Sequence, residues 1–531
     1  MFETILHHPN LVVIDGMKTD TDISAGRYCT GDVLVETQIQ NNVLAVYLTA
    51  DTTKVRNVRL RWNFQTILHG RVLGDAWERT YADMEWMSIN PFRSLPWYVF
   101  VQNGEETAGY GVMVRPGAIC SWFLDPEGIT LYLDVRNGGE GVALNGRRLA
   151  AARVISRIYS GTDPFTAAQD FCRNMCADPI LPSEPVYGFN NWYYAYGHIS
   201  SHIVLNETKY MAKLTEGLSN RPYVVIDDGW QRKRYTADGA FDEEYNGGPW
   251  IPNMHFRDMQ KLAEQMTQQG VIPGIWVRLL LDNSDSIPVE WRLGNGALDP
   301  SIPEVLMMVR DIVDRIGQWG YRLLKHDFST FDITGLWGWQ MTDQMTGDGW
   351  HFADRSKTTA EIIIDFYRTI LEAAKPHNML VLGCNTIGHL GAGLMHMNRI
   401  GDDTSGLEWE RTLKCGVNTL AFRISQHRAF YDVDADCIGI TEHIDWVFNR
   451  QWGKLLSQSG TSLFVSVRPD SLPEDQEKEL IQMLDINSRT REIAIPLDWQ
   501  DTTLPQTWLI DGTTEQFHWM NACDSRPSTG T

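Results

Sequence analysis

YVVIDDGW, at residues 223–230, is a short run of β-branched and aromatic residues that ends in two aspartates. Its length and composition are typical of a strand buried on both faces of a parallel sheet. The pattern of strand, polar strand end and amphipathic helix recurs from about residue 186 to about residue 470. The other strand candidates are VYGFNNWY (186–193), VIPGIWVRLL (271–280), YRLLKHDF (321–328), NMLVLGCN (378–385), MNRIGDDTS (397–405), NTLAFRIS (418–425) and TSLFVSV (461–467). Strands that alternate with helices in this number predict a (β/α)8 TIM barrel, and the lack of a GxGxxG or Walker A motif disfavours a doubly wound sheet.

Further domains are expected on both sides of this barrel, because 531 residues are too many for one compact core. Residues 1–180 contain short strand-like runs separated by turn residues, such as VLVETQIQ at 33–40, and predict a β-sandwich. The Pro-flanked segment LPSEPVYG at 181–188 predicts the boundary to a barrel domain over 181–490. Residues 491–531 predict a short C-terminal β region. The expected fold class is therefore multidomain α/β.

The composition excludes several classes of partner. A formal net charge of −21 repels nucleic acid and anionic membrane surfaces, and no apolar run approaches the roughly 20 residues that span a bilayer. The eight cysteines are scattered, and Cys172 and Cys176 have no second ligand pair at zinc-site spacing, so we expect no metal and no other cofactor. The first residues lack a basic region followed by an apolar run, which predicts a reduced cytoplasmic protein, with a processed secreted form as the alternative. The sequence is compatible with a homo-oligomer.

Polar side chains recur at one place in each predicted barrel unit, the carboxyl end of the strand. These ends meet on one face of a barrel, where the active sites of this fold lie. The residues there are Asp227, Asp228, Trp276, Arg278, Lys325, Asp327, Cys384, Asn385, Arg399, Asp402 and Asp403. A single aspartate could be a helix N-cap, but capping needs one side chain per helix, whereas two of these strand ends carry two acids each. The pattern therefore predicts a pocket lined by carboxylates.

Paired carboxylates in such a pocket suit a retaining glycoside hydrolase, which needs an ionised nucleophile and a protonated acid/base about 5–5.5 Å apart. Lys325 lies two residues before Asp327 on the same face of the strand and favours an ionised Asp327, as a nucleophile requires. The adjacent acids Asp402 and Asp403 raise the pKa of one member of the pair, as a general acid requires. The 20 tryptophans fit this hypothesis, because sugar rings stack on indole faces.

Three motifs resemble those of a known family. IDDGWQ at 226–231, LLKHDF at 323–328 and RIGDDTS at 399–405 are similar to motifs of glycoside hydrolase clan D, family 36, and mostly to its branch of α-galactosidases and raffinose-synthase-like proteins. The resemblance covers the barrel from about 186 to 470 and extends to the order of the domains. It implies a retaining, exo-acting α-glycosidase of the α-galactosidase type. Its substrate would be an oligosaccharide or glycoside with a terminal α-galactosyl or 2-substituted galactosyl unit.

The resemblance also implies roles for individual residues. Asp327 corresponds to the nucleophile. For the acid/base, the family's R-x-S-D-D pattern favours Asp402, whereas a count of four residues from Arg399, as in a related family of the clan, favours Asp403. The implied contacts to the sugar are Asp227 and Asp228 at O4 and O6, Lys325 at O3, Cys384 near O2, and Trp192 and Trp276 as aromatic walls.

Two departures from the family pattern concern the O2 side of the sugar. Gly401 stands where the family usually has serine, and NTIGHLGAG at 385–393 replaces its glycine-rich run. We therefore expect a different O2 side, such as one that admits an acetamido group.

Three other segments carry unusual patterns. GDAWERTYADMEW at 74–86 is predicted to be an exposed hairpin, with the alternative that it caps the barrel mouth and brings Trp77 or Trp86 into the sugar site. The Gly- and Trp-rich segment at 334–354 is predicted to be a substrate-contacting loop. The run DVDAD at 432–436 lacks the glycine and distal glutamate of a calcium loop, and its charge predicts a solvated loop.

Three rival functions remain open at this point. Transfer of galactose to a sugar acceptor, as in raffinose synthases, would use the same covalent intermediate as hydrolysis. A sugar-binding barrel without turnover is disfavoured because both Asp327 and Asp402 are present. A metal-dependent hydrolase or lyase is disfavoured because the strand ends lack the histidine pattern that such barrels need.

Overall fold

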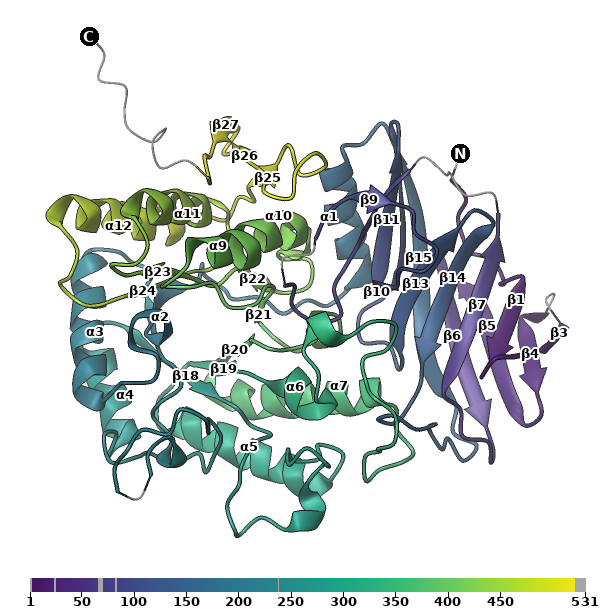
Figure 1. The fold of residues 1–531 in the computed structure, drawn as a ribbon, viewed down its shortest axis with the longest axis horizontal. Helices are drawn as coiled ribbons and strands as arrows, with labels where there is room; N and C mark the ends of the chain where they lie inside the picture. Colours follow the sequence, from purple (N-terminus) through teal and green to yellow (C-terminus); the bar gives the residue numbers. More distant parts are fainter. Residues whose placement is uncertain (1, 23–24, 65–69, 82–83, 237, 521–531) are drawn as a thin grey trace.

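The computed structural model describes residues 2–22, 25–64, 70–81, 84–236 and 238–520. Figure 1 shows a β-rich N-terminal domain on the right, a barrel domain on the left, and a small sheet near the C-terminus that lies above the barrel helices. The arrangement confirms the predicted fold class of an N-terminal sandwich, a central barrel and a short C-terminal β region.

Two antiparallel sheets form the N-terminal sandwich in the described part of the chain. The smaller sheet has the order β10 (Leu95–Pro96), β13 (Ile119–Asp125), β14 (Gly128–Asp134), β7 (Asn57–Asn63), β1 (Leu11–Ile14) and β2 (Met17–Lys18). The larger has the order β3 (Asp20–Asp22), β4 (Arg27–Thr30), β5 (Val33–Gln40), β6 (Val43–Ala50), β15 (Leu149–Ser160), β12 (Glu106–Val112), β11 (Tyr98–Asn103), β8 (Arg71–Gly74) and β9 (Met87–Ser88). In β6 buried and half-buried side chains alternate strictly, as expected of a strand with one face on the core.

The barrel is a parallel sheet whose strands follow one another in chain order. They are β16 (Tyr187–Asn190), β17 (Tyr223–Ile226), β18 (Ile272–Val277), β19 (Leu323–His326), β20 (Leu380–Gly383), β21 (Met397–Arg399), β22 (Asp432–Asp434), β23 (Cys437–Ile440) and β24 (Leu463–Val467). The last strand pairs with the first, β24 with β16, which brings all the carboxyl ends to one face.

The seventh barrel strand differs from the prediction. Residues 418–425 are helical, since a π-helical segment (Leu413–Asn418) leads into α10 (Thr419–Arg423), so the predicted strand is wrong. The position is filled instead by residues 432–440 in two pieces, of which β22 pairs with β21 and β23 pairs with β24. The prediction of a solvated loop at 432–436 is therefore also wrong. Its acids are buried in the barrel, where Arg399 Nη2 lies 2.6 Å from Asp436 Oδ1.

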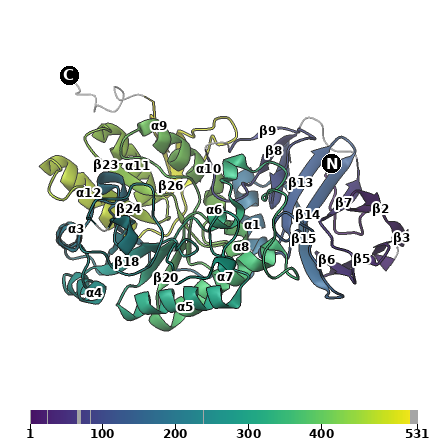
Figure 2. The ribbon, with the colours of Figure 1, turned by 60° about the horizontal axis from the view of Figure 1, so that its bottom comes forward.

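Helices cover the outside of the barrel, as Figure 2 shows for α3 (Ser201–Leu214), α4 (Met259–Gln268), α5 (Pro303–Gln318) and α7 (Thr359–Ala374). Local sequence explains their ends. Pro303 occupies the first turn of α5, where its missing N–H costs nothing. At α7 the Thr358 hydroxyl accepts from the N–H of Glu361 at 3.1 Å, and the Glu361 carboxylate accepts from the N–H of Thr358 at 3.0 Å. The remaining α-helices are α2 (Trp192–Ala195), α6 (Ser329–Thr334), α8 (Gly388–Gly391), α9 (Trp409–Thr412), α11 (Trp446–Gln458) and α12 (Glu474–Asn487).

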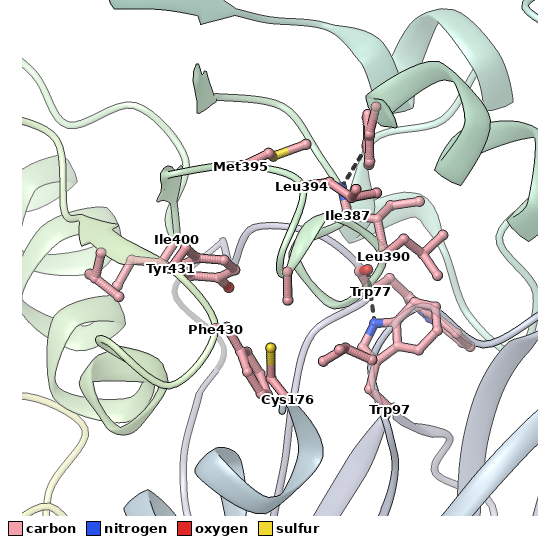
Figure 3. Packing of buried hydrophobic residues seen from close by; sticks show 14 of the residues in the cluster. Trp77, Trp97, Cys176, Ile387, Leu390, Leu394, Met395, Ile400, Phe430 and Tyr431 are labelled. Carbon is pink, nitrogen blue, oxygen red and sulfur yellow. Dashed lines mark hydrogen bonds between the residues drawn. The ribbon is translucent and has the colours of Figure 1, made fainter. Parts of the chain in front are cut away.

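The sandwich and the barrel share one apolar core. Helix α1 (Pro164–Met175) lies between them, and Figure 3 shows Trp77, Trp97 and Cys176 from the first 180 residues packed near Leu390 and Phe430 of the barrel. The Trp97 indole donates to the Trp77 carbonyl at 3.1 Å. The two domains are therefore fixed relative to each other, so that a side chain from the sandwich can hold a defined place in a barrel site.

The C-terminal sheet consists of β25 (Ile495–Pro496), β26 (Thr507–Ile510) and β27 (Thr513–Gln516). Within the described ranges, the helices are all too short or too polar to cross a membrane. Cys523 lies outside the described residues.

Candidate active site

A cavity of about 330 Å³ opens at the carboxyl ends of the barrel strands. It is lined by Arg79, Tyr81, Trp192, Asp227, Asp228, Asn246, Trp276, Lys325, Asp327, Phe328, Trp337, Trp339, Asp402, Asp403 and Arg411. Five of these residues are aspartates and four are tryptophans, so the walls combine hydrogen-bond acceptors with flat apolar faces.

Buried charges form the floor of the cavity. The Lys325 ammonium donates to Asp227 Oδ2 at 2.8 Å, and Asn190 Nδ2 donates to the same oxygen at 2.6 Å. Burial alone would lower the pKa of Lys325, but the neighbouring negative groups, with Asp227 the strongest and Asp327 among them, together outweigh burial, and the pKa lies well above its usual range. The lysine is therefore a fixed positive charge between the ends of β17 and β19.

Asp228 lies beside this pair and is equally buried. Gln231 Nε2 donates to its Oδ1 at 2.6 Å, and Arg234 Nη2 lies 3.3 Å from its Oδ2. Burial raises the pKa of Asp228 to about 7, despite the opposing effect of Arg234. Two buried carboxyl groups therefore lie side by side at the same end of the cavity.

Asp327 follows β19 and is held as a carboxylate. Burial would raise its pKa, but the charges of Lys325 and Arg79, with hydrogen bonds from Trp276 and Phe328, lower it below its usual range. The Trp276 indole donates to Oδ2 at 3.1 Å, and the N–H groups of Phe328 and Asn385 donate to Oδ1 at 2.7 and 3.1 Å. These fixed donors orient the carboxylate as well as ionise it.

The backbone of Phe328, the residue after Asp327, is strained. Its φ is 60°, in the left-handed region that bulky residues rarely adopt. Its N–H donates to the Asp327 carboxylate, and Arg278 lies 4.2 Å from the Phe328 ring centre. Strain of this kind persists only where the surroundings enforce it, and it is common at active sites.

Asp402 and Asp403 differ in their surroundings. Both oxygens of Asp402 are occupied, Oδ1 by Arg79 Nη2 and Oδ2 by Arg411 Nη2, each at 2.8 Å. The Asp403 side chain is 38% exposed to the cavity, against 16% for Asp402. Loss of solvation, with the negative charges of Asp436 and Asp402, raises the pKa of Asp403 to about 6 against the effect of Arg399 and Arg79.

Gly401 precedes this pair at a close contact between elements. A Cβ at this position would overlap the Cys415 carbonyl oxygen of the neighbouring helical segment, so the serine usual in family 36 does not fit here. The departure noted in the sequence is therefore a packing requirement of this chain.

The sandwich domain supplies one wall of the cavity. Thr80 pairs with Gly401, since its N–H donates to the Ile400 carbonyl at 2.9 Å and its carbonyl accepts from the Asp402 N–H at 2.9 Å. This pairing carries Arg79 and Tyr81 over the barrel mouth. The segment from residue 74 onward is therefore a cap and not the exposed hairpin that was preferred from the sequence; residues 82–83 lie outside the described part.

Eight of the residues predicted from the sequence line the cavity together: Trp192, Asp227, Asp228, Trp276, Lys325, Asp327, Asp402 and Asp403. The other five lie outside its lining. Arg278 forms an ion pair with Asp332 at 2.6 Å, and Arg399 lies behind Asp403 at 3.1 Å. Cys384 and Asn385 are buried, and the buried Trp77 donates its indole N–H to the Thr342 carbonyl at 2.9 Å.

The sequence analysis missed seven lining residues: Arg79, Tyr81, Asn246, Phe328, Trp337, Trp339 and Arg411. Trp337 and Trp339 lie in the segment 334–354, which was predicted to contact the substrate, although neither was singled out. Arg79 and Tyr81 lie next to Trp77 in a motif that was singled out for its tryptophans. Within the described ranges, no group of three His, Cys, Asp or Glu side chains is placed to hold a metal ion.

Comparison with solved structures identifies the fold. An α-galactosidase of Thermus thermophilus, in complex with p-nitrophenyl α-D-galactopyranoside, superposes with a TM-score of 0.61 and 17% identity over 91% of this chain and 96% of that chain. A family 36 α-galactosidase variant of Geobacillus stearothermophilus, in complex with 1-deoxygalactonojirimycin, superposes with a TM-score of 0.58 and 14% identity over 90% of this chain and 69% of that chain. A cycloalternan-degrading enzyme of Trueperella pyogenes superposes with a TM-score of 0.51 and 12% identity over 90% of this chain and 78% of that chain.

No protein-family model and no curated protein sequence matches the chain. At these identities the structural likeness shows that the chain has the fold of family 36 α-galactosidases. What the site does follows from its own residues.

Proposed function

We propose that the chain is a family 36 glycoside hydrolase that removes terminal α-galactosyl units with retention of configuration. The observation that carries the proposal is that one cavity contains two carboxyl groups of different kinds. Asp327 is ionised and accepts three hydrogen bonds, whereas the pKa of Asp403 is raised. This division into nucleophile and acid is what a two-step displacement at an anomeric carbon requires.

In the first step, Asp327 Oδ attacks the anomeric carbon while Asp403 gives its proton to the leaving oxygen, and a β-linked glycosyl ester forms. In the second step, Asp403 takes a proton from water as the water attacks the same carbon, and Asp327 is released. Asp403 suits this alternation because it is exposed to the cavity, whereas both oxygens of Asp402 are engaged by arginines. We therefore assign the acid/base role to Asp403 and an orienting role to Asp402.

The sugar is proposed to be galactose because of the buried charged residues that form the floor of the cavity. Asp227 and Asp228 are buried carboxyl groups that would bind the O4 and O6 hydroxyl groups, and Lys325 is a fixed donor beside them. An epimer with O4 directed elsewhere would lose its hydrogen bond to these buried carboxyl groups, and a site built to bind a hydroxyl group rejects such a sugar strongly. Because the floor is buried, the bound sugar ends there, which makes the enzyme exo-acting.

The fold alone does not identify this sugar, since one protein of similar fold degrades cycloalternan. The test is a comparison of p-nitrophenyl α-galactoside, α-glucoside and β-galactoside, with the first product anomer followed by proton NMR. We expect cleavage of the α-galactoside alone, with α-galactose formed first, and the same rate after treatment with a chelator. Initial β-galactose, equal cleavage of the α-glucoside, or loss of activity on chelation would contradict the proposal. Product formed on an added sugar acceptor would identify the transferase alternative.

A further inference from the structure

A second cavity adjoins the catalytic one on the side of the sandwich domain. It has about 290 Å³ and shares Arg79, Tyr81 and Trp339 with the catalytic cavity. Its other walls come from the sandwich around Phe92 and from the barrel loop that ends near residue 343. The two cavities are therefore neighbours, and these three side chains belong to the walls of both.

Two exposed aromatic side chains border this second cavity. Trp339 is 64% exposed and Phe92 is 89% exposed, and they approach the cavity from different domains. Leaving large apolar rings in water is unfavourable, and flat aromatic faces are surfaces on which the C–H groups of sugar rings stack. The pair thus marks a surface for neutral sugar units.

The position of the acid pair decides which part of a substrate would reach this surface. A general acid protonates the glycosidic oxygen, so the leaving group begins next to it. Arg79 Nη2 lies 2.8 Å from Asp402 and Arg79 Nη1 lies 3.8 Å from Asp403, and Arg79 also lines the second cavity. Arg79 therefore links the second cavity to the acid pair, where a leaving group would begin.

We propose that this cavity is a binding site for the second and third sugar units of the leaving group, with Phe92 and Trp339 as stacking surfaces. The inference rests on the proposed function and makes its preferred substrate an oligosaccharide of three or more units. The sandwich domain then contributes to substrate length selection through Phe92.

A third cavity is the alternative place for the leaving group to bind. It has about 260 Å³, shares Tyr81, Asp402 and Arg411 with the catalytic cavity, and is otherwise lined mainly by charged residues that include Glu408. Among its described lining residues, the aromatic one is Tyr81, which is half-buried and also lines the other two cavities, so stacking favours the cavity at Phe92. Glu408 is therefore the matched control position.

The experiment compares two substrates in the full-length protein and in the variants Phe92→Ala, Trp339→Ala and Glu408→Ala. α-Galactosyl fluoride tests the catalytic cavity alone, because its leaving group occupies no sugar site. A linear tetrasaccharide with one terminal α-galactosyl unit tests both cavities. The measured quantity is the ratio of kcat/KM for the tetrasaccharide to kcat/KM for the fluoride.

We expect this ratio to fall about tenfold in Phe92→Ala and in Trp339→Ala, as the loss of one aromatic contact predicts, and to stay unchanged in Glu408→Ala. An unchanged ratio in Phe92→Ala, or a fall in Glu408→Ala instead, overturns the proposed site. If the unmodified protein does not hydrolyse the fluoride, the proposed function itself has failed. The two failures are thus distinguishable.

Discussion

Replacement of Asp403 by alanine removes the group that we propose protonates the leaving oxygen. The structure allows the size of the effect to be worked out. With its pKa raised from 3.8 to about 6, the carboxyl group is protonated in about one molecule in ten at pH 7, against roughly one in 1,600 for an ordinary aspartate. Loss of the acid altogether should cost about 10² to 10⁴ in rate.

The assay is the pH dependence of kcat/KM with two leaving groups. In the unmodified protein, kcat/KM for an alkyl α-galactoside should fall as the pH rises through about 6, since Asp403 is active only when protonated. In Asp403→Ala this basic limb should disappear. The rate with the alkyl galactoside should drop by about 10² to 10⁴, whereas glycosylation from an activated aryl galactoside should be largely spared.

Asp402→Ala is the matched control, because it removes a neighbouring carboxylate and leaves Asp403 in place. We expect it to keep the basic limb, moved to lower pH because the charge of Asp402 no longer raises the pKa of Asp403. If Asp402→Ala instead abolishes the limb and Asp403→Ala retains it, the acid/base is Asp402, as the family pattern favoured, and the reasoning from the arginine contacts is refuted.

Three further predictions concern single residues. Asp228→Ala should lower the ratio of α-galactoside to α-glucoside kcat/KM at least tenfold, and an unchanged ratio in steady-state assays would rule out its role in sugar selection. Trp276→Phe removes the indole donor to Asp327 and should lower kcat about 10- to 100-fold with a smaller change in KM, so an unaltered kcat would count against that hydrogen bond. Asp75→Ala leaves Arg423, 2.9 Å away, as a buried charge at the domain interface and should reduce the free energy of unfolding by about 3–5 kcal/mol; a urea midpoint equal to that of the unmodified protein would contradict this.

The barrel was predictable from local patterns, because most of its strands are apolar runs. The polar residues of the site follow these runs directly in the sequence. YVVIDDGW shows both features within eight residues. The seventh strand was not predictable in this way. Its acidic residues are buried, and one of them, Asp436, pairs with Arg399 from the preceding strand at 2.6 Å. Charge alone indicated a solvated loop, and the apolar run at 418–425 fits a buried helix as well as a strand.

The acids that line the cavity were predicted for the same reason as the strands, but the wall from the sandwich domain was not. Arg79 reaches Asp402 only because Thr80 pairs with Gly401, more than 300 positions along the chain, and no local pattern encodes that pairing. The dense motif at 74–86 signalled a function, yet its tryptophan Trp77 anchors the cap while the neighbouring Arg79 and Tyr81 line the site.

The most direct test of the account is azide rescue of Asp327→Ala. The account places the covalent bond on Asp327, so this variant should have no measurable turnover of an α-galactoside. Added azide, which fits the space of the missing carboxylate, should restore part of the activity and yield β-galactosyl azide. An α-galactosyl azide product, or near-normal hydrolysis without azide, would contradict the account.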